Sequence, residues 1–352
     1  MKAQKCLLHS SPRAQPQPQP RWLSAALPRS SSPVHPRRRP RRHYGSHSTP
    51  RYKPLEVLDD ASIPAFRERC FIPERPMILP RQSFRDIPAY DRWFYRSPTE
   101  PNIARLDTEY LAQHGADALV PLELTQAQAA ESKDSGTEES QDTDTDTETE
   151  TFRTFHAPLS LFLQWIREAE AEAEPAQKQT QSVRLYLAQC HALDLPRHLR
   201  TDLPTPSVVA DAGRGDVYDT NLWIGFPPTY TPLHRDPNPN LFVQLAGRKV
   251  VRLLAPWEGM RVFARVRGEL GRSGGPEAAA FRGEEMMRGR ERALLEGVVW
   301  GGGMDVNSGE EGAEGFEAEL GAGDGVFIPR GWWHSIKGVG QSVTASVNWW
   351  FR

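Results

Sequence analysis

Cysteine is scarce in this sequence, which holds only three cysteines among 352 residues. Cys6, Cys70 and Cys190 are too few for a scaffold built on disulfides, and such low usage is typical of a reducing compartment. They cannot form a four-cysteine zinc site either, so a metal ion would have to bind through histidine and carboxylate groups. Long apolar runs are missing too. Because no stretch of about 18 hydrophobic residues occurs, we expect no membrane span.

Apolar side chains are also fewer than in a fully packed globule. Hydrophobic residues make up 38% of the chain, which also contains 31 Pro and 27 Gly. This composition indicates a folded core diluted by disordered segments. The length is sufficient for one large domain or two ordinary ones.

Acidic residues are absent from the first 55 positions, which hold 12 Lys/Arg, and the first acid is Glu56. The rest of the chain holds 31 Lys/Arg and 45 Asp/Glu, and is therefore net acidic. The N-terminal stretch is rich in Ser, Pro and Gln and has little apolar surface to bury. We therefore predict that residues 1–54 form a disordered basic segment.

The basic segment has three interpretations. An Arg-rich, Ser-rich and acid-free N-terminus is typical of a mitochondrial transit peptide, and Arg42-His43-Tyr44 resembles a matrix-protease cleavage site. The basic run 37–42 instead resembles a nuclear import signal. A solvated basic tail is the third interpretation. We expect mitochondrial localisation, with the nucleus or the cytoplasm as alternatives.

Two further stretches of biased composition interrupt the remaining chain. Residues 131–151 contain nine acids and one Lys, so we predict a self-repelling, disordered acidic insertion. Its alternating Asp142, Asp144 and Asp146 are spaced like the start of a calcium loop, but the required Gly and closing Glu are missing. Residues 268–318 are rich in Gly and Glu and predict a long insertion, with a helix over 282–295. These insertions would lie within one folded domain over 55–352.

Periodic apolar patterns predict the folded elements. A helical stripe over 159–170 places Leu159, Phe162 and Ile166 on one face. Short alternating or apolar runs predict strands near the C-terminus, at 241–245, 249–254, 326–328 and 343–349. Such strands, punctuated by Gly and Pro, indicate a mainly β fold with flanking helices, either a sandwich or a barrel.

His234-Arg235-Asp236 is the first candidate for chemistry. In an extended chain, His234 and Asp236 project to the same side. A third ligand from a distant strand would complete a two-His-one-carboxylate face, which leaves positions open on a non-haem Fe(II). His334, which follows Trp332-Trp333, is a candidate for that ligand. With ten His in the chain, chance alone supplies about one His-x-acid pair, so a surface turn and a packed core histidine are the alternatives.

Lys249 is the second candidate because it shares a predicted strand face with Val251 and Leu253. A lysine on an apolar face must shift its pKa, reach solvent or meet an anion. A dicarboxylate cosubstrate would supply such an anion. The alternative is a lysine at the strand end whose ammonium extends to water.

Several ordered blocks together resemble the JmjC hydroxylases, which are cupin-like oxygenases that use 2-oxoglutarate. The blocks over the predicted core strands are Thr231-Pro232-Leu233-His234-Arg235-Asp236, Asn240-Leu241, Gly247-Arg248-Lys249-Val250-Val251, Gly323 to His334 and Ser346 to Trp350. Upstream blocks at 75–79, 86–89, 120–123 and 185–189 fit as well. The resemblance covers roughly residues 60–352, apart from the two insertions.

The resemblance implies a double-stranded β-helix, the jelly-roll core of the cupins, with an N-terminal helical shell. It further implies Fe(II), with 2-oxoglutarate as cosubstrate and O₂ as oxidant. His234, Asp236 and His334 would be the metal ligands. Lys249 would pair with the distal carboxylate of 2-oxoglutarate, and Thr231 and Tyr186 would donate hydrogen bonds nearby. Asn240 and Asn348 would lie beside the cosubstrate or the metal, and Trp332, Trp333, Trp349 and Trp350 would line the cavity or pack in the core.

The implied function is hydroxylation of a protein side chain or of a modified base in tRNA. A JmjC lysine demethylase is the first alternative, although three Cys leave no histone-reading zinc module. A non-catalytic cupin-like interaction protein is the second. The partner would be a protein or RNA substrate, and the acidic folded part does not favour nucleic acid. No feature of the sequence indicates an oligomeric state.

Overall fold

The computed structural model describes residues 51–127, 150–172, 183–275, 278–279, 284–301 and 314–352. Residues 1–50, with the predicted transit peptide, lie outside this part of the chain, as do most of the acidic insertion and parts of the Gly- and Glu-rich insertion. None of the helices in these ranges is long and apolar enough to cross a membrane.

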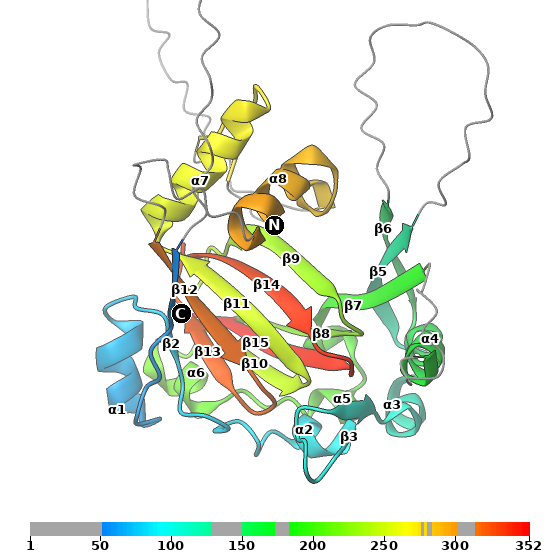
Figure 1. The fold of residues 1–352 in the computed structure, drawn as a ribbon. Helices are drawn as coiled ribbons and strands as arrows, with labels where there is room; N and C mark the ends of the chain where they lie inside the picture. Colours follow the sequence, from blue (N-terminus) through cyan, green and yellow to red (C-terminus); the bar gives the residue numbers. More distant parts are fainter. Residues whose placement is uncertain (1–50, 128–149, 173–182, 276–277, 280–283, 302–313) are drawn as a thin grey trace, which may run out of the picture. The chain divides into compact units, whose positions relative to one another are not determined.

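Two largely antiparallel sheets form the core of the protein (Figure 1). The successive strands β8 to β15 are placed alternately in an eight-stranded and a five-stranded sheet, except that β11 and β12 are neighbours in the smaller one. This order is that of a double-stranded β-helix, so the predicted fold class is confirmed. The strands are β8 (Val217–Gly225), β9 (Thr229–Arg235), β10 (Asn240–Ala246), β11 (Arg248–Leu254), β12 (Glu314–Leu320), β13 (Gly325–Ile328), β14 (Trp333–Val339) and β15 (Thr344–Phe351).

Alternating side chains fill the space between the two sheets. On β11, Lys249, Val251 and Leu253 are buried, whereas Val250 and Arg252 are half-buried, which confirms the shared face predicted from the sequence. The apolar members of this face pack against side chains of β10, β12, β13 and β14. Burying each such side chain contributes roughly 1.5–3 kcal/mol. The strand alternation therefore places Lys249 inside the apolar core.

Helices pack against the larger sheet, and additional strands extend it. The predicted helix over 159–170 is α4 (Leu159–Glu172), whose Phe162, Leu163 and Ile166 are fully buried. The strands β5 (Leu119–Ala127), β6 (Glu150–Pro158) and β7 (Val183–His191) extend the eight-stranded sheet beyond β8. The remaining N-terminal helices are α1 (Ile63–Phe66), α2 (Pro88–Arg92), α3 (Thr108–Gly115), α5 (Arg197–Arg200) and α6 (Ser207–Ala212). Short strands β2 (Met77–Ile78), β3 (Phe94–Arg96) and β4 (Ala104–Leu106) complete this region.

The predicted segment boundaries differ from the structure in two places. Residues 51–54, placed in the disordered segment, form β1 (Arg51–Pro54), which pairs with β12. Its Tyr52 ring lies 4.4 Å from the Arg252 guanidinium and packs on the core, and these contacts account for the regular structure of residues 51–54. The acidic insertion also ends earlier than predicted, because β6 already includes residues 150 and 151.

The second insertion contains more regular structure than its composition suggests. It holds α8 (Gly289–Trp300) and the start of β12 at residue 314. The helix α7 (Pro256–Glu269) lies almost entirely before it. The predicted helix over 282–295 is displaced toward the C-terminus. Val262, Phe263 and Val266 recur at helical spacing after a proline at the first turn, and they are buried. That pattern was a usable signal for α7.

Candidate metal and cosubstrate site

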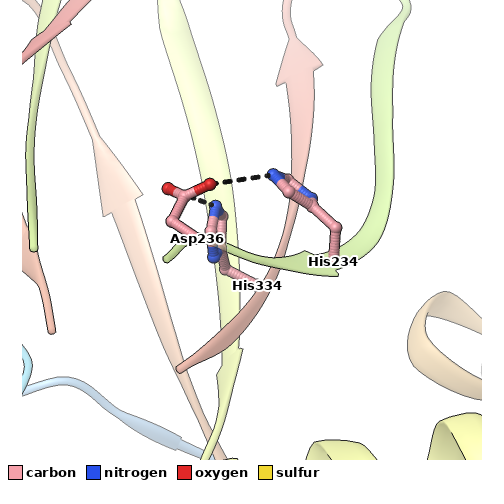
Figure 2. A group of neighbouring side chains, drawn as sticks. All are labelled: His234, Asp236 and His334. Atoms are coloured by element: carbon pink, nitrogen blue, oxygen red, sulfur yellow. Dashed lines mark ion pairs between the residues drawn. The ribbon is translucent and has the colours of Figure 1, made fainter. Parts of the chain in front are cut away.

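His234, Asp236 and His334 converge at one end of the space between the sheets (Figure 2). Their ligand atoms all lie within 4.8 Å of one another. His234 Nε2 is 3.9 Å from Asp236 Oδ1, and His334 Nε2 is 3.6 Å from Asp236 Oδ2. The cluster forms because β9 and β14 are hydrogen-bonded neighbours with His234 directly opposite His334. Asp236 follows the last residue of β9, two positions beyond His234, as the spacing predicted.

Backbone carbonyls orient both imidazole rings. The Nδ1 of His234 lies 2.8 Å from the carbonyl oxygen of Pro232, and the Nδ1 of His334 lies 3.2 Å from that of Trp332. With Nδ1 engaged in this way, each Nε2 lone pair faces the cluster. Burial, and to a lesser extent the neighbouring His234, lower the pKa of His334 to about 4, although Asp236 opposes the shift. His334 is therefore neutral near pH 7, which is the form that binds a metal ion.

Two donors hold the carboxylate of Asp236. Asn240 Nδ2 and Trp350 Nε1 donate to Asp236 Oδ2 over 2.9 and 3.0 Å. Hydrogen bonds of this kind fix the orientation of a ligating carboxylate and stabilise its charge. Two imidazoles and one held carboxylate are the donor set of a two-His-one-carboxylate Fe(II) site.

Lys249 lies in the same space as a buried cation. Its Nζ donates to Ser346 Oγ over 2.6 Å and to the Tyr186 hydroxyl over 3.3 Å. No carboxylate of the described chain contacts it, and burial lowers its pKa to about 7. An anion entering beside Nζ would offset the cost of burying this charge. The environment of Lys249 therefore fits a carboxylate ligand.

All eight residues that the sequence singled out line one cavity of about 30 Å³. They are Tyr186, Thr231, His234, Asp236, Asn240, Lys249, His334 and Asn348. Asn240 Oδ1 and Asn348 Nδ2 are buried and have no hydrogen-bond partner among the described residues. Buried polar atoms of this kind are costly unless a ligand or water satisfies them. They are a second sign that the cavity accommodates a polar group.

Other cavity residues were not assigned roles from the sequence. Trp223 donates its indole N–H to Asn348 Oδ1 over 2.9 Å, and Phe242 and Ile336 form an apolar wall. Of the four tryptophans considered, only Trp350 lines the cavity, whereas Trp333 and Trp349 are fully buried in hydrophobic clusters. The fourth, Trp332, donates to the backbone carbonyl of Glu74.

A double-stranded β-helix with a His-x-Asp…His cluster and a buried lysine defines the class of cupin-type metal-dependent oxygenase folds. Within it, the cupin-like domain family matches residues 64–352, and the chain belongs to this JmjC-type family. The family uses Fe(II) and 2-oxoglutarate with O₂. The donor set described above fits that chemistry.

Individual relatives have modest identity. The chain is 26% identical over 165 residues to lysine-specific demethylase JMJ30 of Arabidopsis thaliana, covering 47% of this chain and 33% of that protein. It is 23% identical over 298 residues to Jumonji C domain-containing protein 5 of Drosophila melanogaster, covering 84% and 59%. A shorter match of 73 residues, 40% identical, to lysine-specific demethylase 8 of Danio rerio covers 20% and 18%. The chain thus spans less than two thirds of each of these relatives.

Proposed function

We propose that this protein is an Fe(II)- and 2-oxoglutarate-dependent oxygenase that hydroxylates a protein side chain. The observation that carries the proposal is the buried Lys249, which has no carboxylate partner among the described residues and lines the cavity that holds the His234–Asp236–His334 cluster. A two-His-one-carboxylate metal site on its own is compatible with many reactions. A buried cation beside it adds selectivity for an anionic cosubstrate.

The cluster residues would hold Fe(II) through the two Nε2 atoms and the Asp236 carboxylate. When bound, iron and 2-oxoglutarate would allow O₂ to oxidise a C–H bond of the substrate while the cosubstrate is decarboxylated to succinate and CO₂. Trp350 and Asn240 hold the carboxylate of Asp236 in one orientation. The carbonyls of Pro232 and Trp332 do the same for the rings.

The other cavity residues would bind and orient the cosubstrate. Lys249 would pair with its distal carboxylate and, because burial has lowered its pKa to about 7, would take up a proton as the anion arrives. Ser346 and Tyr186, which already contact Nζ, would hold the ammonium in place. Phe242 and Ile336 exclude water from the same space.

A protein substrate is favoured over a tRNA base by relatives whose printed name, lysine-specific demethylase, describes action on a protein residue. Lysine demethylation is the second candidate, because several relatives carry the name lysine-specific demethylase. A non-catalytic cupin-like role is the third. A non-catalytic relative would be expected to have lost one of the metal ligands or the lysine, but His234, Asp236, His334 and Lys249 all line the described cavity.

The experiment uses the full chain, purified without metal and supplied with Fe(II), 2-oxoglutarate and ascorbate. Succinate formation by the wild type that is absent in Asp236→Ala supports the oxygenase. Failure of the wild type both to turn over and to bind Fe(II) and 2-oxoglutarate favours the interaction protein. With methylated peptides, release of formaldehyde indicates demethylation, whereas a product gaining only one oxygen indicates hydroxylation.

We also propose that the basic residues 1–54 direct the protein to mitochondria. The proposal rests on the Arg-rich, acid-free composition alone. Fusion of residues 1–54 to a fluorescent protein tests it in cells. Mitochondrial fluorescence that is lost when Arg37 to Arg42 are replaced by Ser and Gln supports the transit peptide, and nuclear fluorescence lost in the same variant supports an import signal.

A further inference from the structure

A second and much larger cavity, of about 580 Å³, adjoins the metal and cosubstrate cavity. It lies between α8, the start of β9 and the strands β5 to β7, which are side by side in the eight-stranded sheet (Figure 1). We call it the basic groove. Its charged lining residues are Arg184, Arg288, Arg290, Arg292 and Lys337 on the one hand, and Glu123 and Glu296 on the other.

Tyr186 connects the two cavities. Its side chain lines the basic groove as well as the smaller cavity, and its hydroxyl is 3.3 Å from Lys249 Nζ. Glu123 lies at this inner end of the groove, because it is the register partner of Tyr186 on the neighbouring strand β5 and also lines the groove. Burial first, and then the Glu123 carboxylate, raise the pKa of Tyr186. A ligand bound along the groove therefore ends next to the candidate site.

The charges of the groove are only partly compensated. Glu296 accepts from Lys337 over 2.8 Å and pairs with Arg292 at 3.6 Å, and both cations also lie over the Tyr230 ring. Arg288 and Arg290 are exposed and pair with no other residue that the structure describes. With five basic and two acidic residues, the groove is net positive.

The helix that carries Arg290 reinforces this field. The groove is lined by residues at the start of α8, where backbone N–H groups contribute partial positive charge. The acid of that first turn, Glu291, is buried and paired with Arg267, 2.9 Å away, so it is not among the groove residues. The groove is thus a positive region on a chain that is net acidic beyond residue 55. Charges arranged in this way attract anionic partners and set their orientation.

We propose that the basic groove binds an acidic peptide segment of the protein substrate, next to the residue that is oxidised. This inference rests on the proposed function, whose substrate class it specifies. A peptide is favoured over nucleic acid because the Tyr230 ring, which would offer a base a stacking surface, already carries the Arg292 and Lys337 cations.

The test is a binding titration of the full chain with a fluorescein-labelled octaglutamate peptide at low ionic strength, followed by fluorescence anisotropy. A labelled octaglutamine peptide controls for the dye. The groove variant is Arg288→Glu/Arg290→Glu. The matched control, Arg197→Glu/Arg214→Glu, changes the net charge equally at two exposed arginines that do not line the groove. We expect the groove variant to bind octaglutamate at least about tenfold more weakly, and the control to stay within about twofold of the wild type.

Three results would overturn the proposal: equal weakening in both variants, no preference for octaglutamate over octaglutamine, or tighter binding of a labelled oligouridylate that only the groove variant loses. The last would assign the groove to nucleic acid. The titration is repeated with the acids between 131 and 148 replaced by Ser, because that stretch would compete as a tethered acidic peptide. Octaglutamate binding in either background supports the proposal, and its absence from both overturns it.

Succinate formation without peptide separates this inference from the proposed function. Arg288 and Arg290 do not line the metal cavity, so the groove variant should match the wild type in that assay. Loss of peptide binding with unchanged succinate supports the groove assignment within an active oxygenase. A wild type that binds octaglutamate through the groove but forms no succinate supports the groove and contradicts the oxygenase.

Discussion

Trp350 on β15 donates its indole N–H to Oδ2 of Asp236, which follows β9, over 3.0 Å. The bond joins the eight-stranded sheet to the candidate metal-binding cluster on the smaller sheet. Since Asn240 donates to the same oxygen, Oδ2 has two partners, while Oδ1 is the oxygen nearer to His234. The orientation of the carboxylate is thus set by residues that are not themselves candidate ligands.

Trp350→Phe should weaken Fe(II) binding by about 10- to 100-fold while leaving the fold intact, because it removes one hydrogen bond and keeps an aromatic ring. The measurement is a metal titration of the purified protein, with circular dichroism to check folding. Trp332→Phe is the control, since its indole donates to the Glu74 carbonyl and not to the cluster. Equal metal affinities in the two variants would show that Trp350 does not position Asp236.

2-Oxoglutarate binding should be accompanied by proton uptake in weakly alkaline solution. The pKa of Lys249, lowered to about 7 by burial, rises again when a carboxylate arrives beside it. Near pH 8 the free lysine is mostly neutral and the bound one charged, so uptake approaches about one proton, and near pH 6 it vanishes because the lysine is already charged. Calorimetry in buffers of different ionisation enthalpy measures this. Uptake that persists in Lys249→Met would assign the proton to another group.

Acid should destabilise the protein partly through His334. Its folded-state pKa of about 4 lies below the unfolded value of 6.5, so between these values only the unfolded chain binds the proton. Stability contributed by the neutral ring is present above pH 6.5 and is lost as the pH falls toward 4. The metal-free His334→Gln variant should therefore show a shallower loss of melting temperature over this range. Parallel curves for variant and wild type would contradict the assignment.

Local sequence patterns predicted the parts of the site that lie close together along the chain or alternate along one strand. His234 and Asp236 are two residues apart, and Lys249 shares the face of Val251 and Leu253. The role of Ser346 could not be predicted in this way. It contacts Lys249 across 97 positions of sequence, and only the placement of β11 opposite β15 brings the two together. Such contacts depend on how the two sheets face each other, which no local pattern encodes.

The strands and helices were predicted unevenly along the chain. The strands near the C-terminus alternate clearly and were predicted, whereas β12 was concealed in a Gly- and Glu-rich stretch. Its Phe316, Ala318 and Leu320 alternate with glutamates that face outward, so the composition masked a strand with a period of two. The helix α7 lies almost entirely before that stretch and was not predicted, although its apolar stripe packs against Trp333, beside His334.

Gly259 on α7 permits that close packing. A Cβ at this position would lie 2.1 Å from Cγ and 2.2 Å from Cδ1 of Trp333, inside a buried ring system that has no room to yield. Gly259→Ala should therefore destabilise the protein by roughly 1–3 kcal/mol through overpacking, despite the better helix propensity of Ala. Because Trp333 precedes His334, displacing the ring should also weaken metal binding.

Gly268 on the same helix supplies the matched control. Nothing lies within 4 Å of the Cβ that an alanine would add there, so Gly268→Ala should gain up to about 1 kcal/mol from helix propensity and leave metal affinity unchanged. Chemical denaturation and metal titration of both variants measure the two effects. Opposite signs in stability, with metal affinity reduced only in Gly259→Ala, would show that α7 supports the site through Trp333. Stabilisation by both substitutions would mean that α7 moves freely relative to the sheet and does not set the position of His334.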